Sequence, residues 1–180
     1  GIQGANWKEE RENRQRGAEF SERLLADLHF ERGFYAYMGD YYGDVRDAAE
    51  AAVDALTGAA PLSDHDLLVN AYRATQYRDS LRRRSTYDEL VSTGNLGLIR
   101  DTELLGIAGR AYQLAVLDNL SREGRESRYR EAFRMLVAND VQRELARSCG
   151  DRPVRRADWD GVAAEIGYPC TLALPVERVE

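Results

Sequence analysis

The sequence predicts an all-α fold: an antiparallel helical bundle with a long N-terminal helix and a small C-terminal appendage. Ala, Leu, Arg and Glu abound and only four prolines occur in 180 residues, a composition that favours helix. Apolar residues also recur three and four positions apart over long stretches, which is the period of a helix that buries one face. A chain of this length suits one domain with a small addition. We therefore expect a helical bundle at residues 1–148 and a short helix with an irregular tail at 149–180.

Residues 5–57 carry the longest helical pattern and predict an N-terminal helical arm. Residues 9–16 form a charged run, and Gly33, Gly39 and Gly43 each cost roughly 1 kcal/mol relative to Ala. The pattern thus allows one helix or a kink near Gly33. Unbroken, it would span about 75 Å, more than a compact domain needs, so it would link the domain to something else. Its apolar positions are Phe20, Leu24, Leu28, Phe34, Met38, Tyr41, Val45, Ala48, Ala52 and Leu56.

The next helix begins after a turn that contains Gly58 and Pro61. Ser63 is a typical N-cap residue, and Asp66 follows at the third helical position. Apolar spacing then predicts a helix that continues to Thr75. The run of Ser, Asp, His and Asp at 63–66 also resembles a metal-binding sequence, but neighbouring helix residues point in different directions, so a cap is the better interpretation.

Residues 77–84 are polar and predict a loop. Three consecutive arginines, Arg82, Arg83 and Arg84, stand at its end. We expect them to be solvated, although such a cluster is also suited to lipid phosphates or an acidic partner.

A compact corner follows the loop. Thr86 and Glu89 have the spacing of a capping box, and Gly94 stands where a glycine ends a helix. Residues 94–97 also match the GxxG spacing of KH-domain loops, but the basic flanks and the sheet of that fold are missing. We interpret these residues as a turn between helices, with Asp101 as the N-cap of the next one.

The rest of the chain predicts further helices. From Asp101, apolar residues continue helically to Leu120, with a possible break at Gly124, and the pattern resumes through Leu145 and ends at Cys149. Residues 158–166 predict a short amphipathic helix, and residues 167–180 an irregular tail.

Composition excludes several classes of function. A net charge of −6 disfavours a nucleic-acid partner. Lys8 is the only lysine, so lysine-based chemistry has almost no candidate. The two histidines, His29 and His65, and the two cysteines match no zinc spacing. No apolar run approaches the ~18 residues of a membrane span. We therefore predict no cofactor, no metal and no enzymatic activity.

The segment 34–44 has the most unusual composition, because it holds four of the ten tyrosines. A tyrosine ring packs well and its hydroxyl can bind a partner, so the segment suits a ligand pocket or a protein interface. The plainer interpretation is packing between helices, with small glycines nearby. The possible ligand or partner residues are Tyr35, Tyr37, Tyr41, Tyr42 and Tyr72.

Four stretches resemble one family. They are NWKEERENRQ at 6–15, RLLADL at 23–28, NAYRATQ at 70–76 and STYDELVSTGNLGLIRDTEL at 85–104. Together they resemble an uncharacterised family of small bacterial single-span membrane proteins, a domain of unknown function.

The resemblance implies a membrane anchor. This chain is similar to the soluble part after the N-terminal membrane helix, and GIQGANW resembles the end of that span. The basic N-terminus typical of that family would stay inside the cell by the positive-inside rule, so the resemblance implies a single-pass protein of the bacterial inner membrane with this domain in the periplasm. Cys149 and Cys170 would be thiols in a reducing compartment. In the periplasm they would form a disulfide.

Two functional hypotheses follow. The first is a non-enzymatic, membrane-anchored extracytoplasmic domain that binds a protein partner or itself as a scaffold. The alternative is a sensory helical bundle with a small-ligand pocket lined by Tyr35, Tyr42 or Tyr72. The packing around these tyrosines distinguishes the two.

Overall fold

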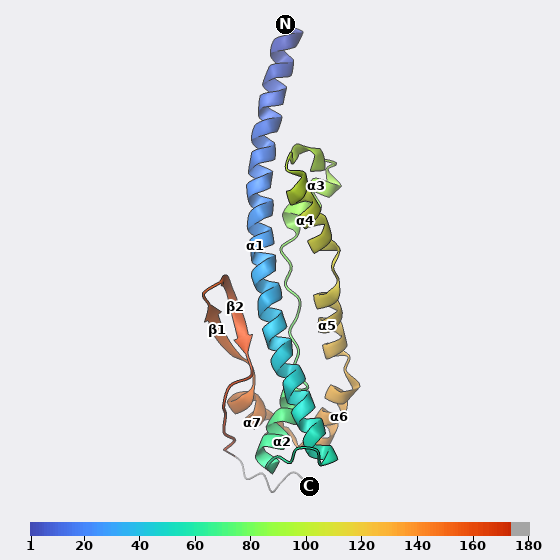
Figure 1. The fold of residues 1–180 in the computed structure, drawn as a ribbon, viewed down its shortest axis with the longest axis vertical. Coiled ribbons are helices and arrows are strands. Elements are labelled where there is room, and N and C mark those ends of the chain that lie inside the picture. The colour runs from blue at the N-terminus through green and yellow to red at the C-terminus, as the bar shows by residue number, and fades with distance from the viewer. Residues whose placement is uncertain (174–180) are drawn as a thin grey trace. The chain divides into compact units, whose positions relative to one another are not determined.

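The computed structural model describes residues 1–173 and is mainly helical, as predicted (Figure 1). It also contains a small two-stranded antiparallel sheet that an all-α prediction does not include. The helices are α1 (Ile2–Thr57), α2 (Asp64–Arg73), α3 (Ser85–Ser92), the 3-10 helix η1 (Leu96–Leu98), α4 (Thr102–Gln113), α5 (Val116–Arg125), α6 (Arg128–Leu136) and α7 (Asn139–Cys149). The strands are β1 (Arg152–Arg156) and β2 (Trp159–Glu165).

Helix α1 is continuous, and no break occurs at Gly33. Large side chains are buried on both sides of this glycine, among them Phe30, Phe34 and Met38. Burying a side chain of this size stabilises by about 1.5–3 kcal/mol, which exceeds the roughly 1 kcal/mol that one helical glycine costs. The predicted long helix is therefore present.

The described chain divides into two compact units. Unit 1 contains residues 1–34 and 81–115, and unit 2 contains residues 35–80 and the described residues from 116 onward. This division groups the described residues after Cys149 with helices that precede them, namely α2, α5, α6, α7 and the C-terminal part of α1. Unit 1 has its own apolar core, made of Phe20, Leu24, Leu90, Ile99, Leu104, Ala108 and Tyr112.

In unit 1 the corner after α3 is a Schellman motif. Gly94 has φ +69°, the left-handed conformation that glycine adopts without steric cost. The Asn95 N–H donates to the Leu90 carbonyl at 2.8 Å, and the Gly94 N–H donates to the Val91 carbonyl at 3.2 Å. Asp101 caps α4 by accepting from the Leu104 N–H at 3.0 Å. The predicted stop and restart are both confirmed.

The predicted capping box at Thr86 is wrong. Helix α3 begins two residues earlier than a cap at Thr86 would place it, and its N-cap, Arg84, makes no side-chain capping bond. Thr86 is buried instead, and Glu89 forms an ion pair with Arg23 on α1. The sequence spacing matched a capping box, but the Thr86 side chain is buried and the Glu89 side chain pairs with Arg23 on α1.

In unit 2 the cap of α2 is confirmed, because Ser63 accepts from the Asp66 N–H at 3.1 Å. The later breaks differ from prediction. The helix that starts at Asp101 ends at Gln113, and α5 continues through Gly124. A Cβ at Gly124 would lie 2.4 Å from the Cβ of Tyr77, so this glycine permits a close approach rather than a break.

Residues 158–166 are not a helix. Most of them form β2, which pairs with β1 so that Arg152 lies opposite Glu165, and the side chains of this pair lie 3.1 Å apart. An isolated two-stranded hairpin is marginally stable, so packing must support it. Trp159 supplies that packing by stacking on Tyr37 of α1 at 5.4 Å between ring centroids. Contacts distant in sequence therefore outweigh local helical spacing.

Candidate functional site

The five predicted tyrosines are all buried or half-buried. Tyr37 and Tyr41 are buried on α1, and Tyr42 is half-buried beside them. Tyr35 is also half-buried on α1. Tyr72 is buried on α2, where its ring packs against Phe133 rather than against the other tyrosines. The structure thus brings together three of the five residues, and we call Tyr37, Tyr41 and Tyr42 the tyrosine cluster.

The hydroxyl of Tyr41 belongs to a charged network. It donates to Oδ1 of Asp151 at 2.8 Å, and Arg78 Nη1 lies 3.3 Å from Oδ2 of the same carboxylate. One carboxylate therefore joins α1, the loop after α2 and the start of the hairpin. Each partner is compensated, as a partly buried charge requires.

Tyr42 fixes the backbone of the same loop. Its hydroxyl donates to the Arg78 carbonyl at 3.2 Å and accepts from the Arg78 N–H at 3.3 Å. The hydroxyl of Ser121 on α5 also donates to that carbonyl, at 2.8 Å. The loop that contains Arg78 is thus attached to two helices of unit 2.

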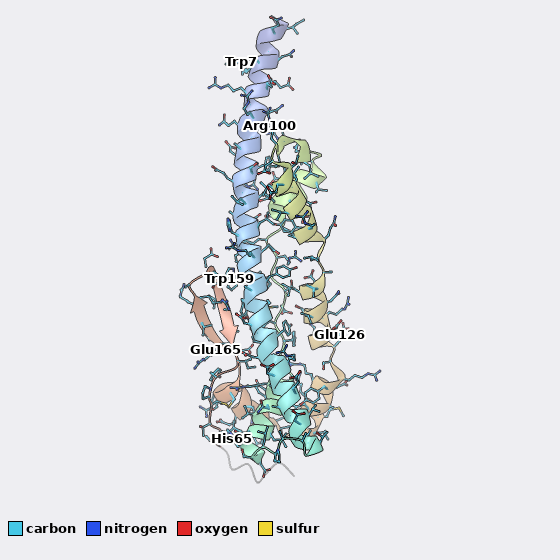
Figure 2. All side chains as sticks on the ribbon, viewed as in Figure 1. Trp7, His65, Arg100, Glu126, Trp159 and Glu165 are labelled. Carbon is cyan, nitrogen blue, oxygen red and sulfur yellow. A yellow bond between two sulfur atoms is a disulfide. The ribbon has the colours of Figure 1, made fainter. Side chains whose placement is uncertain are left out.

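The hairpin closes the other side of the cluster. Trp159 points toward α1 in Figure 2, and its ring stacks on Tyr37 at an angle of 16°. Arg156 adds an ion pair with Asp40 of α1, with 2.7 Å between the nearest atoms. Tyr37 in turn makes an edge contact with Tyr41, with ring centroids 6.3 Å apart. The rings thus pack in series from Tyr42 through Tyr41 and Tyr37 on α1 to Trp159 on β2.

Burial makes these hydroxyls poor acids. It raises the pKa of Tyr41 above the ordinary tyrosine value, and the charge of Asp151 raises it further. Burial also raises the pKa of Tyr42, and it raises the pKa of Tyr72 to about 12. The three groups stay protonated near neutral pH, where they act as hydrogen-bonding and packing groups rather than as nucleophiles or bases.

Unit 1 contains a buried ion pair that the sequence analysis did not predict. Glu31 on α1 is 2% exposed and Arg82 is 9% exposed, and Glu31 Oε2 accepts from Arg82 Nε at 2.8 Å. The other Glu31 oxygen accepts from the Arg83 N–H at 2.6 Å. Arg82 also donates to the carbonyls of Ala111 and Leu114 at 3.0 Å each, at the C-terminal end of α4.

The prediction of a solvated arginine run is therefore wrong for Arg82. Arg83 lies over the Phe30 ring at 3.7 Å, and Arg84 pairs with Asp88 on the surface. The signal was available in the sequence, because Glu31 falls on the apolar stripe of α1 between Leu28 and Phe34. A carboxylate in that position requires a cationic partner.

The C-terminal appendage is attached covalently. Cys149 at the end of α7 and Cys170 form a disulfide. Arg73 on α2 donates to the Tyr168 carbonyl at 2.7 Å and to the Cys149 carbonyl at 3.2 Å, and its Nη2 lies 3.4 Å from the Sγ of Cys170. One arginine, Arg73, therefore contacts both cysteine residues of the bridge and the neighbouring Tyr168 carbonyl.

The other sequence candidates are distributed over the molecule. His65 Nδ1 donates to Oδ1 of its neighbour Asp66 at 2.9 Å, beside the α2 cap. Among residues 1–173 no group of three or more metal-ligating side chains is assembled. A surface hollow of about 380 Å³ lies at the joint of α5 and α6. It is lined by Arg125, Glu126, Ser127, Arg130, Glu131, Arg134 and Met135, which include none of the predicted tyrosines.

Comparison with known proteins assigns this chain to no protein family. No protein-family model, no curated protein and no solved structure matches this chain. The resemblance to a family of single-span membrane proteins stays a prediction. Over the described residues, none of the helices has both the length and the apolar character that crossing a membrane demands.

Proposed function

We propose that this chain is a non-enzymatic helical-bundle domain, anchored to a bacterial inner membrane, that acts in the periplasm as a scaffold and binds a protein partner or itself. The observation that carries the proposal is the start of α1. Residues 2–16 are helical and every one of them is exposed. A helix that is exposed on all sides contributes little to a core and is suited to bridging between a domain and another body.

The composition of this arm supports a membrane-proximal position. The Trp7 ring is exposed, lies on the N-terminal part of α1 in Figure 2 and carries the Arg11 guanidinium 5.6 Å from its centroid. Tryptophan with nearby cations is enriched where membrane proteins meet the lipid headgroups. The disulfide between Cys149 and Cys170 supports a periplasmic location, because such bonds persist in oxidising compartments.

The packed tyrosines favour a scaffold over a small-ligand sensor. A sensor needs a cavity into which polar groups converge. The hydroxyls of Tyr41 and Tyr42 instead converge on Asp151 and on the Arg78 backbone. Their raised pKa values also argue against catalysis by these groups.

Light scattering tests self-association, and cross-linking in native membranes tests partner binding. The chain should scatter as a concentration-dependent oligomer, or cross-link to a defined protein when it is expressed behind a membrane helix. The matched control carries the same anchor on an unrelated helical domain. A strictly monomeric chain whose cross-links equal those of the control would contradict the proposal.

A further inference from the structure

The residues after the hairpin lie on α2 and α7 as an extended strap, which we define as residues 168–173. The cluster below it contains Leu68, Val69, Tyr72, Phe133, Val141, Leu145 and Cys149. Cys170 and Leu172 pack against this cluster, whereas Pro169, Thr171 and Ala173 are exposed. Alternation with a period of two is the pattern of an extended segment with one buried face.

Side chains of α2 and α7 bind the strap through its backbone. Besides the Arg73 bond to the Tyr168 carbonyl, His65 Nε2 accepts from the Leu172 N–H at 3.3 Å. Glu144 Oε1 accepts from the Ala173 N–H at 3.0 Å. The Tyr168 hydroxyl also donates to the Gly150 carbonyl, and Arg152 lies over the Tyr168 ring. All of these contacts are non-covalent, so the disulfide is the covalent attachment of the strap to α7.

We propose that the strap is a redox-controlled cover, which reduction of the Cys149–Cys170 disulfide releases from the apolar face of α2 and α7. Cys149 is fully buried and Cys170 is half-buried, so an incoming thiolate reaches the sulfur of Cys170 first.

The exchange balances with a dithiol reductant, such as a thiol–disulfide oxidoreductase. Its thiolate attacks Cys170 Sγ and forms a mixed disulfide, and the sulfur of Cys149 leaves and takes up a proton. The second thiol of the reductant then attacks the mixed disulfide and releases Cys170. Two electrons pass to the protein, and the reductant becomes a disulfide.

Arg73 is the positioning residue of this device. Its guanidinium lies 3.4 Å from Cys170 Sγ, so it stabilises the thiolate of Cys170 relative to the thiol. The thiolate is the form that attacks a disulfide. By stabilising the Cys170 thiolate, Arg73 therefore favours re-formation of the Cys149–Cys170 disulfide by an oxidant. The same cation holds the Tyr168 carbonyl, which keeps the start of the strap near Cys149 while the rest is free.

Hydrogen exchange of the full chain with and without dithiothreitol tests the release. Closing a loop of about 20 residues restricts the open states on the order of a hundred-fold, so amides of residues 170–173 should exchange faster by about that factor after reduction. Amides of α2 and α7 should keep their protection. Equal exchange rates of the strap amides in both states would overturn the proposal. Loss of protection throughout α2 and α7 would also overturn it, because the disulfide would then stabilise the whole fold rather than the strap alone.

Alkylation of the reduced chain tests Arg73 separately. Cys170 should react faster than Cys149, with a pH midpoint below the ordinary thiol value of about 8.5. Arg73→Gln should move this midpoint to higher pH, and Arg73→Lys should restore it in part. An unchanged pH profile in Arg73→Gln would overturn the role of Arg73, whatever the stability of the variant.

Discussion

Single residues decide how the corner after α3 is built. Gly94 has positive φ, and a Cβ added there would meet no atom within 4 Å. The only penalty for a side chain is therefore the left-handed backbone itself. Gly97, three residues later, also has open space, but its φ is not positive. Comparing substitutions at Gly94 and Gly97 therefore isolates the cost of backbone strain, because neither site is crowded.

We expect Gly94→Ala to lower the free energy of unfolding by about 1–2 kcal/mol, the cost of left-handed conformation for a residue with a Cβ. Gly97→Ala should change it by less than about 0.5 kcal/mol, as surface substitutions usually do. Urea denaturation of both variants measures the difference. Equal stability of the two variants would show that Gly94 is not needed for its conformation.

Burial distinguishes two ion pairs of unit 1 that have similar geometry. Glu31 and Arg82 are 2.8 Å apart and nearly inaccessible, whereas Glu89 and Arg23 are 2.9 Å apart and about half exposed. Breaking a buried pair leaves a charge without compensation and costs about 3–5 kcal/mol. Breaking an exposed pair costs about 0–1 kcal/mol.

Glu31→Gln should therefore destabilise the chain by several times more than Glu89→Gln. Glutamine keeps the shape and one acceptor for the Arg83 N–H, so the difference reports the lost charge beside Arg82. Thermal denaturation of the two variants, followed by circular dichroism, measures it. Similar losses of stability in both would contradict the assignment of Glu31 as a buried anchor.

At the scale of elements, three local signals predicted correctly, whereas the capping box at Thr86 and the helical spacing over residues 158–166 did not. The caps at Ser63 and Asp101 and the stop at Gly94 depend on neighbouring residues, so sequence spacing reveals them. The hairpin containing Trp159 depends on a ring of α1 more than a hundred positions away. The burial of Glu31 was visible as a charge on an apolar stripe, but its partner Arg82 was not, because nothing local brings the two together.

The strap also predicts a pH dependence through Glu144. Bonds from Ser148, from the Ala173 N–H and from Arg147 lower the pKa of Glu144 from 4.5 to about 2. A carboxylate whose pKa is lower in the folded state stabilises that state above the unfolded pKa. Its contribution is thus complete above about pH 5 and disappears as the pH falls toward 2.

Glu144→Gln should accordingly have a lower melting temperature than the unmodified chain near neutral pH. The difference in melting temperature should disappear as the pH falls from about 4.5 to 2. Melting curves of both chains across this pH range measure the difference in melting temperature. Glu50→Gln, at an exposed position of α1, is the matched control and should show a much smaller difference throughout. A difference for Glu144→Gln that persists unchanged at pH 2 would show that the carboxylate is not the group involved.

At the scale of the whole molecule, α1 supplies buried residues to both units and leaves apolar residues exposed near its end. Val53 is 57% exposed and Leu56 is 73% exposed, and they lie three residues apart on one helix face. Leu62 in the following turn is also exposed. The net charge of −6 over 180 residues is too small to prevent contact between apolar patches of two chains.

If the chain associates with itself, this end of α1 is the apolar surface that we expect to be used. Val53→Asp combined with Leu56→Asp should weaken the association at least about ten-fold, because a charge buried in an interface has no compensation there. Val162→Asp is the matched control, since Val162 on β2 is 62% exposed and belongs to the same unit. Sedimentation equilibrium over a range of concentrations measures all three chains. Association that survives in the double variant, or that Val162→Asp weakens equally, would assign the contact to a different surface.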